Sequence, residues 1–221
     1  MEKADTMKRS KQRFPREYQC KEMLIINYHN ITYPDMNNGD GLRVVLWLSG
    51  CSHRCFKCQN PQTWDVNSGI LFDKKAKEEL FRELENDYIS GLTLSGGDPL
   101  NEANLDGVLE IVTEFNDRYK TLNSKKISKS NLLCGNKTIW LYTGFTWEQI
   151  MSPVAVADYD PKQDEALQKR RMIVSKCDVL VDGRYIHSER DLSLKYRGSK
   201  NQRVINIEES INENVLAYKC E

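Results

Sequence analysis

Residues 42–58 read LRVVLWLSGCSHRCFKC and carry the pattern that decides the fold. The run over 42–48 is apolar and contains β-branched residues, which is typical of a buried strand. Cys51, Cys55 and Cys58 follow that run directly. We therefore expect a loop with three thiols at the carboxyl end of a central strand.

The three cysteines suggest a metal centre, because soft thiolates that converge from one loop favour iron-sulfur clusters or zinc. The spacing supplies three ligands and no fourth, so a four-iron cluster held there would keep one iron open. His53 could instead join the cysteines in a structural zinc site. A closed zinc site usually draws its ligands from two separated pairs, and no second pair follows in the sequence. These residues favour the iron-sulfur interpretation and leave zinc open.

Strand and helix patterns alternate along the rest of the chain. Apolar residues at helical spacing predict one helix that begins after Asp73, its N-cap, and a second helix over about 102–119. Short apolar runs predict strands over 91–95, 138–142 and 177–181. This alternation predicts an α/β fold in which helical crossovers join parallel strands.

Turn residues stand at the carboxyl ends of these strands. The sequence there reads GGDP over 96–99, TG over 143–144 and DG over 182–183. Because parallel sheets gather functional loops at the carboxyl ends of their strands, we expect these turns and the cysteine loop to share one face. For the last two turns, a local need for glycine explains the sequence as well as a functional role does.

Composition narrows the class of protein. Thirty-two basic and 32 acidic residues give a formal net charge of +0, which does not favour nucleic acid or an anionic membrane as a partner. No apolar run approaches the roughly 20 residues that cross a bilayer. Residues 1–22 are charged and lack the apolar stretch of a secretory signal, so we expect a cytoplasmic protein. Seven unevenly spaced cysteines argue against a disulfide framework.

Taken together, these motifs resemble the radical S-adenosylmethionine superfamily and, within it, the activating enzymes of anaerobic, class III, ribonucleotide reductases. The likeness covers about residues 23–207. The motifs that carry it are CSHRCFKC (51–58), NGDGLR (38–43), LSGGDPL (94–100), VDG (181–183) and RGSKNQ (197–202).

The resemblance implies a fold and its division along the chain. The fold would be a partial, incomplete TIM-like barrel of parallel strands with helical crossovers. Residues 1–22 would form a charged extension ahead of the radical S-adenosylmethionine domain over 23–207. Within that domain 121–137 would be a polar insertion, and 208–221 would form a C-terminal tail.

The resemblance also implies a site. Cys51, Cys55 and Cys58 would bind a 4Fe-4S cluster, whose open iron would take the amino and carboxylate groups of S-adenosylmethionine. Contacts to that cofactor would come from six residues near two strand ends: Lys57, Cys58, Gln59, Gly96, Gly97 and Asp98. Many members of the superfamily carry an aromatic residue just before the third cysteine, where this chain has lysine.

The implied activity is the formation of a glycyl radical. An external one-electron donor of the flavodoxin or ferredoxin type would reduce the cluster, and S-adenosylmethionine would be cleaved to methionine and a 5′-deoxyadenosyl radical. That radical would take hydrogen from a glycine of the large subunit of the anaerobic reductase. No catalytic side chain is predicted. The alternatives are an activase of another glycyl-radical enzyme and a zinc-stabilised binding module without catalysis.

Overall fold

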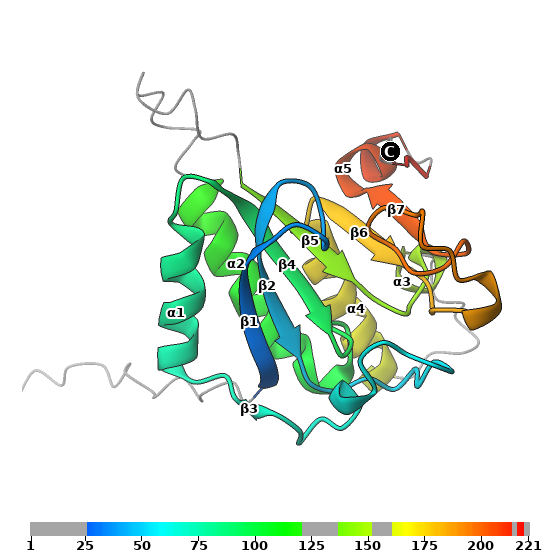
Figure 1. The fold of residues 1–221 in the computed structure, drawn as a ribbon, viewed down its shortest axis with the longest axis horizontal. Coiled ribbons are helices and arrows are strands. Elements are labelled where there is room, and N and C mark those ends of the chain that lie inside the picture. Colours follow the sequence, from blue (N-terminus) through cyan, green and yellow to red (C-terminus); the bar gives the residue numbers. More distant parts are fainter. Residues whose placement is uncertain (1–25, 121–136, 152–160, 214–215, 219–221) are drawn as a thin grey trace, which may run out of the picture.

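One seven-stranded sheet organises the protein, in the order β3-β1-β2-β4-β5-β6-β7 (Figure 1). The computed structural model describes residues 26–120, 137–151, 161–213 and 216–218. The strands are β1 (Asn27–Asp35), β2 (Leu42–Leu48), β3 (Ile70–Leu71), β4 (Ile89–Gly96), β5 (Thr138–Tyr142), β6 (Val179–Asp182) and β7 (Arg203–Asn206). The α-helices are α1 (Lys74–Leu84), α2 (Leu105–Tyr119), α3 (Trp147–Met151), α4 (Pro161–Ser175) and α5 (Ile207–Asn212).

The centre of the sheet is parallel, as predicted: β2 pairs with β4, β4 with β5, and β5 with β6. The outer strands are antiparallel, whereas the sequence predicted only parallel strands. β1 pairs with β2 and β3, and β7 pairs with β6, all in the antiparallel sense. Since the strand order has two ends, the architecture is an open, mixed α/β sheet.

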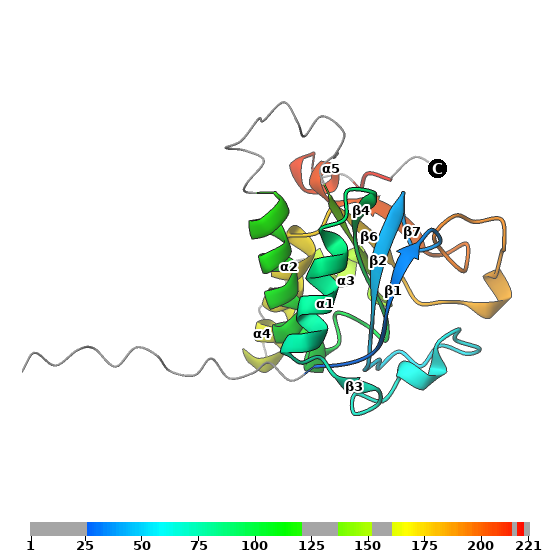
Figure 2. The same ribbon diagram turned by 60° about the vertical axis from the view of Figure 1, so that its left-hand side comes forward.

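Helices cover one face of the sheet, and long loops cover the other (Figure 2). α1, α2 and α4 lie on the helical face, where Leu46, Leu94 and Leu141 from three neighbouring strands are fully buried with Val108 and Phe115 of α2. Burying a side chain of this kind contributes about 1.5–3 kcal/mol. This apolar layer holds the parallel strands in register, so that their carboxyl ends meet along one side.

The predicted helices are present, with a shift at one boundary. The Asp73 side chain caps α1 by accepting a hydrogen bond from the Ala76 N–H at 2.8 Å, as predicted. The second helix was expected from about 102, but a 3₁₀ turn over Glu102–Asn104 precedes α2. That turn begins where the Asn101 side chain accepts from the Ala103 N–H, which is an N-cap pattern.

A buried arginine, Arg43, closes the loop-covered face of the sheet near the amino ends of the parallel strands. Arg43 donates hydrogen bonds to the Thr93 hydroxyl (2.6 Å) and to the carbonyl oxygens of Leu92 (2.6 Å) and Thr138 (2.7 Å). Its guanidinium also lies 5.6 Å from the centre of the Trp140 ring. Burial lowers the pKa of Arg43 to about 10. Arg43 therefore ties three strands together beneath the space at their carboxyl ends.

The segment predicted as a C-terminal tail contains α5 and a short return to the sheet. The Asn206 side chain caps α5 by accepting from the Glu209 N–H at 3.3 Å. Beyond α5 the chain comes back to β7, where the Asn206 N–H donates to the Ala217 carbonyl oxygen at 3.0 Å. The extension over 1–22 and the insertion, apart from Lys137, lie outside the described residues. In the described parts of the chain, no helix is long and apolar enough to span a membrane.

Candidate functional site

The cysteine loop leaves the end of β2 and folds back on the segment around a 3₁₀ turn at Pro61–Thr63. The Cys51 N–H donates to the Trp64 carbonyl oxygen at 3.0 Å, and the Cys58 N–H donates to the Cys55 carbonyl oxygen at 3.1 Å. Two residues between the cysteines, Arg54 and Lys57, have positive φ angles of 46° and 55°. Residues other than glycine rarely adopt this left-handed backbone conformation, so the surroundings must hold the loop in a specific shape.

Backbone N–H groups point at two of the three sulfurs. Burial raises the pKa of the Cys51 thiol, while hydrogen bonds from the backbone N–H groups of His53 and Arg54 oppose this rise. The Asn60 N–H donates to Cys58 Sγ at 3.3 Å. Hydrogen bonds to the sulfurs are one means by which proteins stabilise iron-sulfur clusters and set their potential. All three cysteines are free and half-buried, so the loop fits such a cluster.

The arrangement is less suited to zinc. Thiolates around one tetrahedral zinc ion lie roughly 4 Å from one another. Among the residues that the structure describes, no three histidine, cysteine or carboxylate side chains gather in a way that could hold a single metal ion.

The glycines after β4 bring that strand end against the start of the cysteine loop. The Gly97 N–H donates to the Leu48 carbonyl oxygen and the Asp98 N–H to the Gly50 carbonyl oxygen, both at 2.7 Å. A Cβ on Gly96 would lie 2.8 Å from the backbone of Leu48. The close contact between the two backbones therefore requires glycine here, whether or not a cofactor is bound.

Asp98 joins three strand ends through one buried carboxylate, which is 1% exposed. It accepts hydrogen bonds from the Thr143 hydroxyl at 2.9 Å and from the Gly144 N–H at 3.0 Å, both just after β5. On the other side, His53 Nε2 of the cysteine loop lies 2.7 Å from Asp98 Oδ2. The predicted sharing of one face by these turns is thus confirmed, and 143–144 contribute to the junction.

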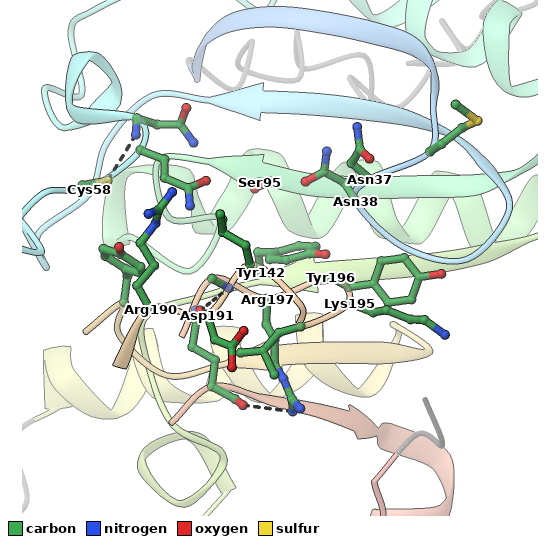
Figure 3. Close-up of a pocket in the computed structure, with 18 of the residues that line it drawn as sticks. Asn37, Asn38, Cys58, Ser95, Tyr142, Arg190, Asp191, Lys195, Tyr196 and Arg197 are labelled. Atoms are coloured by element: carbon green, nitrogen blue, oxygen red, sulfur yellow. Dashed lines mark hydrogen bonds between the residues drawn. The ribbon is translucent and has the colours of Figure 1, made fainter. Parts of the chain in front are cut away.

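A pocket of about 760 Å³ opens beside the cysteine loop (Figure 3). Cys58 and Gln59 line it, together with Trp47, Ser95 and Tyr142 near the ends of three parallel strands. Trp47, a large aromatic residue of a kind that usually packs in a core, contributes to this wall. Small-molecule pockets have volumes of about 300–1,000 Å³, so this one can hold a nucleoside-sized cofactor.

One polar group in the pocket wall is unsatisfied. The Tyr142 hydroxyl is buried and has no hydrogen-bond partner among the described residues. Burial raises the pKa of Tyr142, so the phenol keeps its proton at neutral pH. Because buried polar groups are rarely left without a partner, this hydroxyl suits a ligand with a polar atom at that position.

The opposite wall of the pocket comes from residues 190–202, part of the segment that leads from β6 to β7. Gln202 shapes this wall, since its side-chain oxygen accepts from the Gly198 N–H at 2.9 Å and its amide donates to the Gly183 carbonyl oxygen at 3.0 Å. No site residue was predicted in 197–203. The RGSKNQ motif at 197–202 was the signal that could have placed one there.

The predicted site residues are not all in the pocket wall. Cys58 and Gln59 line it, whereas Cys51 and Cys55 lie in the same loop beside it. Lys57 is exposed, and its ammonium lies 3.3 Å from His187 Nε2. Gly96, Gly97 and Asp98 form the turn that abuts the cysteine loop.

Comparisons with known proteins identify the family of this chain. The family described as "4Fe-4S single cluster domain" matches residues 37–205. A protein of Vibrio cholerae is 36% identical over 179 residues, which cover 80% of this chain and 96% of the relative. One of Escherichia coli K12 is 34% identical over 181 residues (81% and 97%), and one of enterobacteria phage T4 is 36% identical over 181 residues (81% and 93%). All three are named anaerobic ribonucleoside-triphosphate reductase-activating protein.

Proposed function

The chain belongs to the family of anaerobic ribonucleoside-triphosphate reductase-activating proteins, and from this membership we propose that it is a radical S-adenosylmethionine enzyme that generates a glycyl radical on the anaerobic reductase. One observation carries the proposal: the loop with three free cysteines borders a pocket of cofactor size at the carboxyl ends of the parallel strands. That is where α/β proteins bind their ligands.

Cys51, Cys55 and Cys58 hold the 4Fe-4S cluster in this proposal. Lys57, Cys58, Gln59 and the turn over 96–98 contact S-adenosylmethionine. When bound, the cluster and cofactor supply a 5′-deoxyadenosyl radical, formed with one electron from an external donor of the flavodoxin or ferredoxin type, and this radical takes hydrogen from a glycine of the reductase.

The protein's own residues position these groups and limit the access of water. Backbone N–H groups hold the sulfurs of Cys51 and Cys58, and the Asp98 junction holds the loop against β4. The segment over 190–202 closes one side of the pocket. No side chain has to transfer a proton for hydrogen-atom abstraction, so we assign none as catalytic.

We also propose that the sheet is the incomplete TIM-like barrel of radical S-adenosylmethionine enzymes. Support comes from the parallel order β2-β4-β5-β6, from the crossovers through α1, α2 and the α3–α4 pair, and from the site at the strand ends. A sheet that stays open leaves room for a loop of the partner to enter beside the cofactor.

The alternatives are less well supported. An activase of another glycyl-radical enzyme would share the loop and the pocket, but the names of the relatives favour the reductase. A zinc-stabilised binding module would explain the cysteines alone. It would leave unexplained the pocket beside them and the buried Tyr142 hydroxyl.

Anaerobic purification tests the proposal. The protein should contain iron and sulfide and, when reduced, should convert S-adenosylmethionine to methionine and 5′-deoxyadenosine. Incubation with the anaerobic reductase should then give a glycyl-radical signal by electron paramagnetic resonance. Cys55→Ala should remove the iron and both activities. Stoichiometric zinc without iron after reconstitution would refute the cluster, whereas cofactor cleavage without a glycyl radical would point to a different partner.

A further inference from the structure

His53 lies between the first two cysteines and is anchored at its side chain and at its main chain. Its Nε2 atom lies 2.7 Å from Asp98 Oδ2, and the side chain is only 12% exposed. Its carbonyl oxygen accepts a hydrogen bond from the guanidinium of Arg184, which follows β6. One residue of the cysteine loop is thus connected to the ends of two other strands.

Packing around the imidazole is close on the side of β5. The ring meets Phe145 edge-on, with the ring centres 4.7 Å apart. A Cβ on Gly144 would overlap the imidazole, so a larger residue there would have to displace the ring. The position of His53 is therefore fixed by shape as well as by its contact with Asp98.

The same residue is linked to the sulfur of Cys51. The backbone N–H of His53 donates toward Cys51, and the next residue, Arg54, has the left-handed conformation that turns the loop. A shift of the imidazole would move this N–H and the turn with it. The contact with Asp98 is thus coupled to the geometry of the first cluster ligand.

We propose that His53 is a positioning residue, which holds the cysteine loop at a set distance from the turn over 96–98 so that one bound cofactor can reach both. This inference rests on the proposed function. It gives His53 a role that needs no metal bound to the imidazole. It also gives 143–144 a role, since Thr143 and Gly144 hold the Asp98 carboxylate in place.

Two substitutions of His53 separate its polar contact with Asp98 from its bulk. His53→Gln keeps an N–H donor that can reach Asp98, whereas His53→Leu fills similar space without a donor. His187→Leu is the matched control, because His187 also touches the cysteine loop, through Lys57 and Phe56, and lies outside the Asp98 junction. Iron and sulfide are measured after anaerobic reconstitution. The affinity for S-adenosylmethionine is taken from the change that it causes in the electron paramagnetic resonance spectrum of the reduced cluster.

All three variants should load the cluster, because the three cysteines are intact. The dissociation constant for S-adenosylmethionine should rise about tenfold or more in His53→Leu, because this variant loses the polar contact that holds the loop against the buried Asp98 carboxylate. It should stay close to the wild-type value in His53→Gln and in His187→Leu.

Three results would overturn the inference. Wild-type affinity in His53→Leu would show that the contact does not position the cofactor, and loss of iron equal to that of Cys55→Ala would make His53 a ligand. If His53→Leu does not fold, Gly144→Ala replaces it, because the added methyl displaces the imidazole without removing it, and unchanged affinity in that variant would contradict the proposal. A wild-type protein that loads the cluster but shows no spectral response to S-adenosylmethionine would instead refute the proposed function.

Discussion

The carbonyl oxygen of Gly50 lies 2.5 Å from the position that a Cβ of residue 97 would occupy, so Gly97 and Gly50 bring two loops into direct backbone contact. One loop carries the cysteines, and the other carries the Asp98 carboxylate. The glycine-rich turn thus has a structural function that exists before any cofactor binds. The stability of the cluster-free protein should depend on it.

Gly97→Ala should therefore destabilise the cluster-free protein, because the methyl group can be fitted only by moving the backbone of Gly50. Overpacking of this kind costs about 1–3 kcal/mol, which urea unfolding followed by circular dichroism can measure. Gly198→Ala is the control, since its Cβ would meet only side-chain atoms, those of the Tyr185 ring at 3.2 Å and of Gln59 at 3.4 Å. Equal losses in the two variants would show that the Gly97 contact is not tight.

Arg43→Met should lower the free energy of unfolding by about 3 kcal/mol, because it leaves buried carbonyl oxygens without their donor. These are the oxygens of Leu92 and Thr138, which Arg43 joins across β4 and β5. Denaturant unfolding gives the value. The control, Arg82→Met, removes an arginine whose side chain is 64% exposed and should cost far less. A small effect at Arg43 would mean that water can replace the guanidinium.

Acid should weaken the fold through Glu148. Hydrogen bonds from Arg203 lower the pKa of Glu148 to about 2, against about 4.3 in an unfolded chain. A carboxyl whose pKa is lower in the folded state adds stability above its unfolded pKa, and this contribution is lost as the pH falls toward the folded value. The Glu148 side chain is 56% exposed, so solvent screening limits the contribution to about 1 kcal/mol or less.

Glu148→Gln should accordingly lower the melting temperature at pH 7, and its difference from the wild type should shrink between about pH 5 and pH 3. Differential scanning calorimetry at several pH values measures this convergence. Glu213→Gln, at an exposed position after α5, serves as the comparison and should show no such trend. A difference that stays constant with pH would exclude Glu148 as the source.

Substitutions of different cysteines should differ in their effect on the iron content of the protein. Cys51→Ala should lose the cluster, whereas Cys177→Ala should retain it and lose only stability. Cys177 is 5% exposed in the core and donates from its sulfur to the Ile173 carbonyl oxygen at 3.2 Å. Iron and sulfide analysis after anaerobic reconstitution distinguishes them. Iron loss in a well-folded Cys177→Ala protein would contradict the assignment.

The two residues beside the third cysteine should differ in their effect on cofactor binding. Gln59 lines the pocket and packs near Gly198, so Gln59→Ala should raise the dissociation constant for S-adenosylmethionine about two- to tenfold, as loss of one hydrogen bond does. The Lys57 ammonium contacts His187, and Lys57 does not line the pocket, so Lys57→Ala, which keeps the backbone, should change the constant less than twofold. Titration of the reduced variants with S-adenosylmethionine gives both dissociation constants. A larger increase in Lys57→Ala than in Gln59→Ala would show that the Lys57 side chain contacts the cofactor.

The sequence predicted the elements whose pattern is local and regular. β2 is an apolar run, and α1 has both a helical apolar face and the Asp73 cap, so each was recognisable alone. β1 escaped prediction because its sequence, NYHNITYPD, is largely polar and contains a proline, and β7 has only four residues. Both depend on pairing with a central strand rather than on their own pattern.

The site likewise has features that a local sequence pattern predicts and features that only the fold creates. The spacing of the cysteines is a local signal and identified the loop. The role of Asp98 as a junction depends on His53 and Thr143, which lie 45 residues before and 45 residues after it in the sequence. Only the folded sheet brings the three residues together. The wall over 190–202 has no periodicity, so apart from its RGSKNQ motif no sequence pattern could have placed it beside the pocket.

The return of the chain after α5 has a consequence for how copies of this protein behave at high concentration. The outermost strand of a sheet exposes unpaired N–H and C=O groups, which can act as a template for pairing with another molecule. Here Ala217 and Tyr218 occupy part of that outer side of β7, and the opposite border is a strand of only two residues, β3. Removing the last residues would uncover β7 and favour self-association, so purification tags are better placed where they leave this pairing intact.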